Sequence, residues 1–228
     1  MKRKNLAVQR IDKALISGVV GRTNQIHSVP EADQAEMAIP SYLNPNPLVR
    51  SIFWKRYAQV YKLSDLSKDM TVCEFGCGIG AFLPTLSKNV AKTYAIDLFP
   101  QYAYELAQEL NLNIVFSTSL NTIPDNSLDI LLAVEVLEHL DDLKASLEII
   151  FRKLKPGGKL LMSGPTESTL YKVGRFVIGY NKYHDYHRND VYDLCQGILE
   201  NGFELEKTVY FPNRLILLNL ICLFRADK

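Results

Sequence analysis

The stretch Val72-Cys73-Glu74-Phe75-Gly76-Cys77-Gly78-Ile79-Gly80-Ala81 is a short apolar run that breaks into a glycine-rich turn and then enters a helical pattern. A strand that delivers the chain to such a turn is typical of nucleotide sites, because glycines let the backbone come close to a ligand. The helix that follows directs its free N–H groups and its positive dipole end at the bound molecule. The stretch therefore predicts a ligand site directly after a first strand.

Two classes of ligand fit this turn. Gly76-x-Gly78-x-x-Ala81 matches the loose dinucleotide fingerprint, and Asp97 follows 21 residues after Gly76, where a ribose-binding acid is expected. The same residues form Glu74-x-Gly76-x-Gly78-x-Gly80, which resembles the first motif of class I methyltransferases that use S-adenosylmethionine (SAM). Glu74 favours SAM, because a carboxylate attracts its cationic amino group and would repel a pyrophosphate.

The composition is that of one α/β domain with a sizeable core. The chain has 228 residues, of which 47% are hydrophobic and 22% charged, and its formal net charge of +1 provides no overall attraction to nucleic acid. The cysteines are dispersed and show no disulfide or zinc framework, so we expect a reducing, cytoplasmic compartment. They are Cys73, Cys77, Cys195 and Cys222. We expect neither a membrane span nor a cleaved signal peptide.

The N-terminal part reads as an extension of the domain. Residues 1–22 carry six basic side chains and one acidic one, with apolar residues at roughly helical spacing. They predict a basic helical arm that packs on the domain, with peripheral binding to an anionic membrane as the alternative. Residues 21–47 are polar and contain four prolines, which predicts a loop or linker. The boundaries are therefore 1–47 for the extension and 48–228 for the domain.

The remaining chain alternates strands with helices. This order predicts a doubly wound, mostly parallel sheet with right-handed crossovers. The expected strands span 71–75, 93–97, 113–116, 128–134, 159–163, 204–210 and 215–224. The expected helices span 48–63, 81–87, 100–110, a stretch from Asp141 or Asp142 to about Leu154, and one from Asn189 or Asp190 to Gly202.

Further motifs extend the resemblance to roughly residues 50–228. Phe151-x-x-Leu154-Lys155-Pro156-Gly157-Gly158 is similar to the turn before strand five in class I methyltransferases, and Pro124–Asp129 is similar to their turn before strand four. A final hairpin also fits that fold, in which the last strand runs antiparallel. The sequence most resembles the small-molecule methyltransferases of ubiquinone and menaquinone biosynthesis, and the resemblance implies a Rossmann-like fold.

The resemblance also implies a set of cofactor-binding residues. Asp97 is expected to accept hydrogen bonds from both ribose hydroxyls, and Leu98 and Phe99 to pack on the adenine. Ser117 and Thr118 occupy a position where relatives often carry an aspartate that faces the adenine amino group. The full set is Glu74, Gly76, Cys77, Gly78, Asp97, Leu98, Ser117, Thr118, Glu135 and Val136.

Glu135-Val136-Leu137-Glu138-His139 follows the fourth strand and has the form Glu-x-x-Glu-His. The pattern resembles the divalent-metal ligands of ubiquinone-pathway O-methyltransferases. Glu135, Glu138 and His139 could thus hold Mg²⁺ or a similar cation that orients a substrate hydroxyl. The alternative, which we favour, is that Glu138 and His139 hold the turn by hydrogen bonds.

The segment Thr166–His187 is long for a connection and interleaves tyrosines and Phe176 with lysines and arginines. Long loops at this face of a sheet usually carry function, so we predict a substrate lid at about 164–188. His184 and His187 are candidate general bases for a hydroxyl acceptor, or hydrogen-bond the lid to the body.

Together these features predict a SAM-dependent methyltransferase that acts on a small or lipid-like acceptor, with O-methylation favoured. Two alternatives stay open: a nicotinamide-dependent oxidoreductase, and a non-catalytic protein with the same fold. The near-neutral charge argues against a nucleic-acid partner. The oligomeric state is not defined by the sequence.

Overall fold

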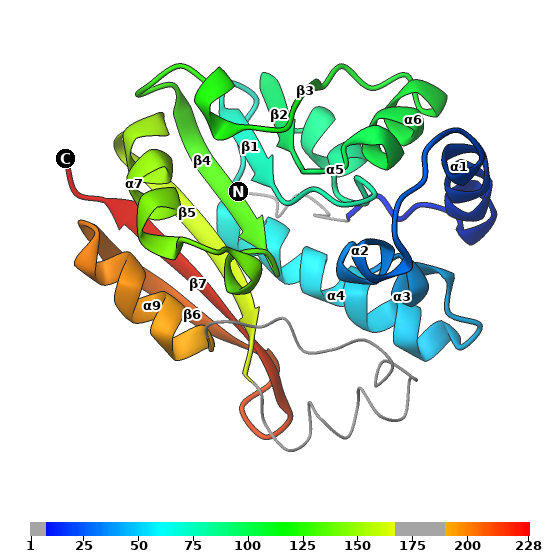
Figure 1. Ribbon diagram of the computed structural model, residues 1–228. Helices are drawn as coiled ribbons and strands as arrows, with labels where there is room; N and C mark the ends of the chain where they lie inside the picture. The colour runs from blue at the N-terminus through cyan, green and yellow to red at the C-terminus, as the bar shows by residue number, and fades with distance from the viewer. Residues whose placement is uncertain (1–7, 167–189) are drawn as a thin grey trace. The chain divides into compact units, whose positions relative to one another are not determined.

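The computed structural model describes residues 8–166 and 190–228. Its seven strands follow the order β3-β2-β1-β4-β5-β7-β6 (Figure 1). All observed pairs are parallel except those of β7, which runs antiparallel to β5 and β6. The predicted fold class is thus confirmed. The strands are β1 (Thr71–Phe75), β2 (Lys92–Ile96), β3 (Val115–Ser117), β4 (Leu128–Val134), β5 (Leu154–Pro165), β6 (Phe203–Pro212) and β7 (Leu217–Ala226).

The chain divides into two compact units. The first comprises Met1–Met70 and Gly76–Ser119, and the second comprises Thr71–Phe75 and Leu120–Lys228. The first unit holds β2, β3 and the helices α1 (Lys13–Ile26), α2 (Glu31–Glu36), α3 (Ile39–Leu43), α4 (Pro47–Ser64), α5 (Leu83–Ser87) and α6 (Gln101–Glu109). The second holds the other strands, α7 (Leu143–Lys153), α9 (Val191–Glu200) and the short 3₁₀ turns η1 (Leu120–Thr122) and η2 (Leu137–His139).

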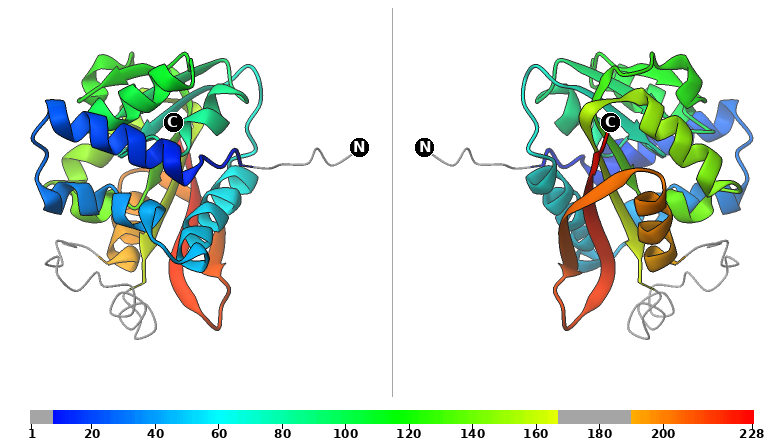
Figure 2. Two further views of the ribbon diagram at one scale, coloured as in Figure 1. Left: turned by 90° about the vertical axis from the view of Figure 1, so that its right-hand side faces the viewer. Right: turned by 90° about the vertical axis from the view of Figure 1, so that its left-hand side faces the viewer.

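Helix α1 is the basic helical arm that the sequence predicts. It begins at Asp12, whose side chain accepts a hydrogen bond from the Ala14 N–H at 2.7 Å. It packs against α6 of the same unit (Figure 2), where Arg22 forms an ion pair with Glu109 at 2.9 Å. The expected packing of the arm on the domain is therefore observed, and membrane binding remains a prediction.

The prediction of a loop over residues 21–47 is wrong. Helix α1 continues to Ile26, and α2 and α3 follow. Pro30 is the residue that precedes α2, Pro40 lies in the first turn of α3, and Pro47 is the first residue of α4. Proline is tolerated at these positions, because the first N–H groups of a helix have no partner within the helix. Three of the four prolines that suggest a linker thus stand at the starts of helices, at α2, α3 and α4.

Helix α4 confirms the helix predicted for residues 48–63. Its apolar side packs around Phe82, which is fully buried and follows the glycine turn directly. The Tyr57 ring stacks on Phe82 with centroids 4.7 Å apart, and the Tyr61 ring meets Phe82 edge-on at 6.4 Å. Such pairs contribute about 0.5–1.5 kcal/mol beyond the burial of their surface. These ring contacts hold α4 against Phe82, directly after the glycine turn.

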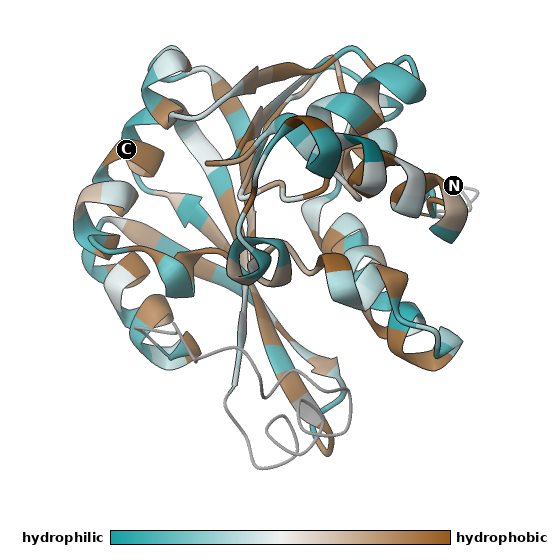
Figure 3. Cartoon of the chain, turned by 45° about the vertical axis from the view of Figure 1, so that its right-hand side comes forward, coloured by the Kyte–Doolittle hydropathy of each residue, from teal (hydrophilic) through white to brown (hydrophobic). Residues whose placement is uncertain are grey.

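The core of the second unit centres on β4 and β5. Ile130 through Ala133 are at most 1% exposed, and Leu160, Leu161 and Met162 are fully buried. In Figure 3, apolar segments recur along the strands, and in Figure 1 helices α7 and α9 lie together beside β5. Each fully buried leucine or isoleucine stabilises the fold by about 1.5–3 kcal/mol. The continuous apolar run after Ser127 is therefore a strand covered on both faces, as predicted.

The ends of α7 and α9 agree with their sequence signals. The Asp142 side chain accepts from the Ala145 N–H at 2.9 Å, and Asp190 accepts from the N–H groups of Tyr192 and Asp193. The fifth strand starts earlier than predicted, at Leu154, because Leu128 pairs with Leu154 across a register shift. No helix in the described part of the chain is long and apolar enough to cross a membrane.

Candidate active site

The glycine turn is built from left-handed backbone in the first unit. Gly76, Gly78 and Gly80 have φ values of 72°, 52° and 79°, which side chains other than glycine rarely adopt. The N–H groups of Gly76 and Cys77 donate to the Ile96 carbonyl at 2.8 and 3.2 Å. The turn is therefore fastened to the carboxyl end of β2.

Gly80 also lets α6 approach. A Cβ atom at this position would lie 2.9 Å from Leu83 Cδ1 and 3.0 Å from the Ala103 Cβ. These separations are shorter than van der Waals contact, and the left-handed backbone adds to the strain of any side chain. Gly80 thus sets the packing of α6 against the turn.

Asp97, at the end of β2, orders the same turn. Its Oδ2 atom accepts from the Gly78 N–H at 2.7 Å, and Oδ1 accepts from the Phe99 N–H at 2.9 Å. Burial raises the pKa of this carboxyl, and the hydrogen bonds from Phe99, Gly78 and Leu98 oppose that increase. A carboxylate oxygen has two lone pairs, so each can accept one further donor. Asp97 can therefore hold the turn and still bind a diol.

The residues around Asp97 match the prediction to different degrees. The Asp97 N–H donates to the Ser117 carbonyl at 3.2 Å, so the end of β3 lies beside it, while Thr118 is exposed. Leu98 is 78% exposed. An exposed leucine beside a binding turn is available to pack on an aromatic ring, so its contact with an adenine stays a prediction.

The extension covers the glycine turn, which the sequence did not indicate. A Cβ atom on Gly78 would lie 3.4 Å from the Met37 carbonyl oxygen and 3.5 Å from its Cα. Met37 follows α2, and the next residue, Ala38, has left-handed backbone with a φ of 55°. The polypeptide between α2 and α3 thus passes directly over the turn, and no sequence motif marks this contact.

In the second unit, β1 and β4 are parallel neighbours, with Glu74 in register with Leu132. The strand order reverses between them, and ligands of such sheets bind at the carboxyl ends of the strands at that point. Glu74 lies one residue before the end of β1 and is 1% exposed. Its predicted role toward the amino group of SAM stays a prediction.

Glu135, the residue after β4, is the centre of a polar cluster. Its Oε1 accepts from the Ser163 hydroxyl at 2.6 Å, and Oε2 accepts from the Asn219 amide at 2.8 Å. Its own N–H donates to the Ser163 carbonyl at 3.0 Å. Ser163 is fully buried and Asn219 is 5% exposed. Three strands, β4, β5 and β7, therefore converge on one carboxylate.

The backbone of Glu135 is strained. Its φ is 56°, in the left-handed region that costs a residue with a Cβ about 1–2 kcal/mol. Strain of this kind persists where the surroundings enforce it, and it is frequent at functional sites. Glu135 is among the cofactor-binding residues predicted from the sequence, whereas Ser163 and Asn219 are not. Each is an isolated polar residue within an apolar strand, which was the available signal.

The predicted metal ligands do not form a recognisable centre among the described residues. In residues 8–166 and 190–228, no group of three or more His, Cys, Asp or Glu side chains could hold a metal ion. Glu138 is buried within η2, and His139 and Val136 are half-buried. Ligation by Glu135, Glu138 and His139 stays a prediction, and no step of the mechanism below depends on it.

The predicted lid is outside the part of the chain that the structure describes, apart from its first residues. His184 and His187 are among residues 167–189 and are not placed. Their assignment as general bases is therefore untested.

Residues 53–205 match the family model described as a methyltransferase domain. Among curated proteins, the chain is similar to phosphoethanolamine N-methyltransferase 3 of Arabidopsis thaliana, with 30% identity over 147 residues that cover 61% of this chain and 30% of that protein. It is also similar to the ubiquinone biosynthesis O-methyltransferase of Idiomarina loihiensis, with 28% identity over 99 residues, 40% of this chain and 41% of the relative. The alignments thus span well under half of each relative.

Solved structures share the fold. N-methyltransferase NodS from Bradyrhizobium japonicum, in complex with S-adenosylhomocysteine (SAH), superposes with a TM-score of 0.66 and 20% identity, covering 87% of this chain and 98% of that one. A SAM-dependent methyltransferase from Aquifex aeolicus superposes with a TM-score of 0.64 and 22% identity, covering 84% and 97%. These structures support the fold, and the family match over residues 53–205 favours the methyltransferase interpretation of the glycine turn over the dinucleotide interpretation.

Proposed function

We propose that this chain, which belongs to the methyltransferase domain family, is a SAM-dependent methyltransferase that transfers the methyl group to an oxygen of a small or lipid-like acceptor. The observation that carries the cofactor part of the proposal is the geometry of Asp97. Its carboxylate is fixed by the N–H groups of Gly78 and Phe99 and keeps acceptor capacity on both oxygens. That arrangement suits the ribose of SAM lying against the glycine turn.

The bound cofactor supplies a sulfonium-activated methyl group, and the protein does not need to form a covalent intermediate. The work of the chain's own residues is to hold the two partners in line and to exclude water. Asp97 and the turn orient the ribose, and the segment at Met37 covers Gly78. Buried Glu74 is the proposed partner of the cationic amino group.

Transfer to oxygen is supported by the motif after β4. Glu135-x-x-Glu138-His139 resembles the pattern of ubiquinone-pathway O-methyltransferases, one of which is among the relatives above. A hydroxyl acceptor must lose its proton during transfer, and His184 or His187 is the proposed base. The proposal does not require a divalent cation at the Glu-x-x-Glu-His motif, and the acceptor screen varies this cation.

Calorimetric titration of the purified protein with SAM, SAH and NAD tests the cofactor site. We expect the wild-type protein to bind SAM and SAH and not NAD. Asp97→Ala should weaken SAH binding by about 100-fold, because it removes two charge-assisted hydrogen bonds to the ribose. Asp193→Ala changes an exposed aspartate of α9 and should bind SAH like the wild type. Binding of NAD alone, or equal affinity of Asp97→Ala and wild type, would refute the assignment.

An acceptor screen with labelled SAM then tests the chemistry, with and without Mg²⁺. Phenols and lipid-like alcohols are compared with primary amines. Methylation of hydroxyls supports the proposal, and exclusive methylation of amines contradicts it. A dependence on Mg²⁺ that Glu138→Gln abolishes would place a cation at the motif.

A further inference from the structure

Two of the four cysteines meet in the second unit, although they are 27 residues apart in sequence. Cys195 lies on α9 and Cys222 lies on β7, and their Sγ atoms are 3.8 Å apart. The sequence shows no disulfide framework, since nothing in the spacing of the cysteines brings this pair together. The contact is created by the packing of α9 near the final hairpin.

The surroundings of the pair suit a reactive dithiol. Cys195 is half-buried, so one side of the pair lies near solvent, while Cys222 is 1% exposed. Thr208 on β6 places its hydroxyl oxygen 3.7 Å from Cys222 Sγ. The thiol of Cys195 lowers the pKa of Cys222 by hydrogen bonding, and the same interaction raises the pKa of Cys195. Cys222 is therefore the sulfur favoured as the thiolate, and the more exposed Cys195 supplies the second thiol.

We propose that Cys195 and Cys222 are a site of reversible oxidation that forms an intramolecular disulfide with hydrogen peroxide or a related small peroxide. A thiolate of the pair attacks the peroxide, the O–O bond breaks, and a sulfenic acid and one water form once a proton is taken up. The second sulfur then attacks the sulfenic sulfur, the S–S bond forms, the S–O bond breaks, and a second water leaves. The two thiols lose two electrons and two protons, and the peroxide is reduced to two waters.

The bond would connect α9 with the strand that carries Asn219, the residue that holds Glu135. The first residue of α9, Val191, lies against Gly164, where an added Cβ would be 3.2 Å from Val191 Cγ2. Gly164 follows Ser163, the other partner of Glu135. Oxidation therefore acts on an element in contact with the polar cluster, and dithiothreitol should reverse it.

The test is peroxide treatment of the folded protein, followed by tryptic peptide mapping without reduction. Cys195 and Cys222 fall on different peptides, 189–207 and 215–225. We expect a linked species of these two peptides that lacks two hydrogen atoms and separates on reduction. The thermal midpoint of the oxidised protein should rise by about 5 °C, because the cross-link restricts the unfolded chain.

Cys195→Ser and Cys222→Ser should each abolish the linked species, and Cys73→Ala, which changes a cysteine buried in β1, should retain it. Circular dichroism before and after treatment establishes that the fold persists. The proposal is overturned if wild-type protein gives sulfinic or sulfonic acid at either cysteine in place of the link. It is also overturned if the linked peptides contain Cys73 or Cys77, or if both thiols stay reduced until the protein unfolds.

Discussion

Strand β4 is bracketed by two residues with left-handed backbone, and the two are of different kinds. Asn126, in the turn before the strand, has a φ of 51°, and Glu135, directly after it, has a φ of 56°. Asparagine tolerates this conformation several-fold better than most residues, whereas glutamate gains nothing from it. The same backbone geometry is thus relaxed at one end of β4 and strained at the other.

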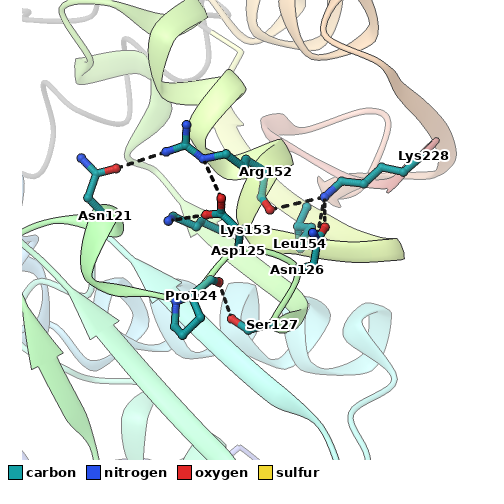
Figure 4. A network of polar contacts seen from close by, with 9 residues as sticks. All are labelled: Asn121, Pro124, Asp125, Asn126, Ser127, Arg152, Lys153, Leu154 and Lys228. Atoms are coloured by element: carbon teal, nitrogen blue, oxygen red, sulfur yellow. Dashed lines mark hydrogen bonds and ion pairs between the residues drawn. The ribbon is translucent and has the colours of Figure 1, made fainter.

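The turn before β4 is held by charged groups, of which Lys153 is buried while Asp125 and Arg152 are about half-exposed. Lys153 reaches Asp125 at 2.6 Å, Arg152 approaches the same carboxylate at 3.3 Å, and Lys228 donates to the Asn126 side chain at 2.8 Å (Figure 4). The Asn126 N–H donates to the Arg152 carbonyl at 3.0 Å. Each charged or polar group of this turn has a partner within the second unit, so these contacts hold the turn in place.

After β4, two hydrogen bonds to Glu135 come from uncharged, buried side chains. Glu135 accepts from the Ser163 hydroxyl and the Asn219 amide, both buried, and no cation contributes to either hydrogen bond. The left-handed backbone at Glu135 is itself costly for stability, so the contacts around this residue must enforce it. From this difference we predict that the turn before β4 contributes to folding, and that the turn after β4 contributes to the reaction.

Of the substitutions that test this difference, Glu135→Gln has the largest expected effect. The change keeps the length of the side chain and removes its charge, so we expect the rate of methyl transfer to fall by about 100-fold. The free energy of unfolding should change by about 1 kcal/mol or less, because the amide can still bond to Ser163. Steady-state kinetics with the acceptor from the screen, together with urea unfolding, measures both quantities.

Glu200→Gln is the matched control, since Glu200 is exposed at the end of α9. It should alter neither quantity. SAH titration of Glu135→Gln separates two contributions: weaker binding assigns Glu135 to the cofactor, and unchanged binding assigns it to the acceptor. If the Glu135→Gln protein were active but less stable, both ends of β4 would contribute to stability alone, and the proposed contrast between them would be wrong.

Asp125→Asn tests the end before the strand and should affect stability alone. It leaves the Lys153 ammonium, whose side chain is 5% exposed, without its carboxylate. Removing one member of a buried ion pair lowers the free energy of unfolding more than replacing both members does, because the remaining charge stays buried without its partner. The urea midpoint of Asp125→Asn should therefore fall clearly at pH 7, while Lys153→Met, which removes the buried charge itself, should stay closer to wild type. Methyl transfer should be unchanged in both.

The stability lost in Asp125→Asn should decrease as the pH falls. The hydrogen bond from Lys153 lowers the pKa of Asp125 below its ordinary value. The carboxylate therefore contributes stability above an unfolded-state pKa of about 3.9, and loses it as the pH falls through the lower folded-state pKa. The difference between wild type and Asp125→Asn should shrink as unfolding is measured from pH 7 toward pH 3. A constant difference would mean that shape, not charge, holds the turn.

Much of the fold followed from periodicity and caps. The strands over 71–75 and 128–134 have the predicted bounds, and Asp142 and Asp190 cap the helices as expected, because these signals are local. The segment 21–47 was mistaken for a linker, because a proline in the first turn of a short helix looks the same as one in a loop. Only packing against the rest of the first unit distinguishes them.

The polar groups and cysteines described above also differ in whether a local sequence pattern predicts them. Gly76, Gly78 and Asp97 can be predicted as a group because their motif is contiguous or has a fixed spacing, and the structure joins Gly78 to Asp97 directly. Ser163, Asn219 and the pair of Cys195 with Cys222 were missed as groups. Their members meet through strand register and helix packing, which a single sequence does not encode as a local pattern.

The smallest expected effect isolates the left-handed backbone at Asn126. Asn126→Gly and Asn126→Ala both remove the amide that accepts from Lys228, so the difference between the two variants reports the cost of a Cβ in this conformation. We expect the alanine variant to unfold about 1 kcal/mol more easily than the glycine variant, with equal rates of methyl transfer. Equal stabilities in urea would mean that the turn relaxes around a side chain. The strain at Glu135 would then need no functional explanation, because the surroundings of a left-handed residue could adjust at either end of β4.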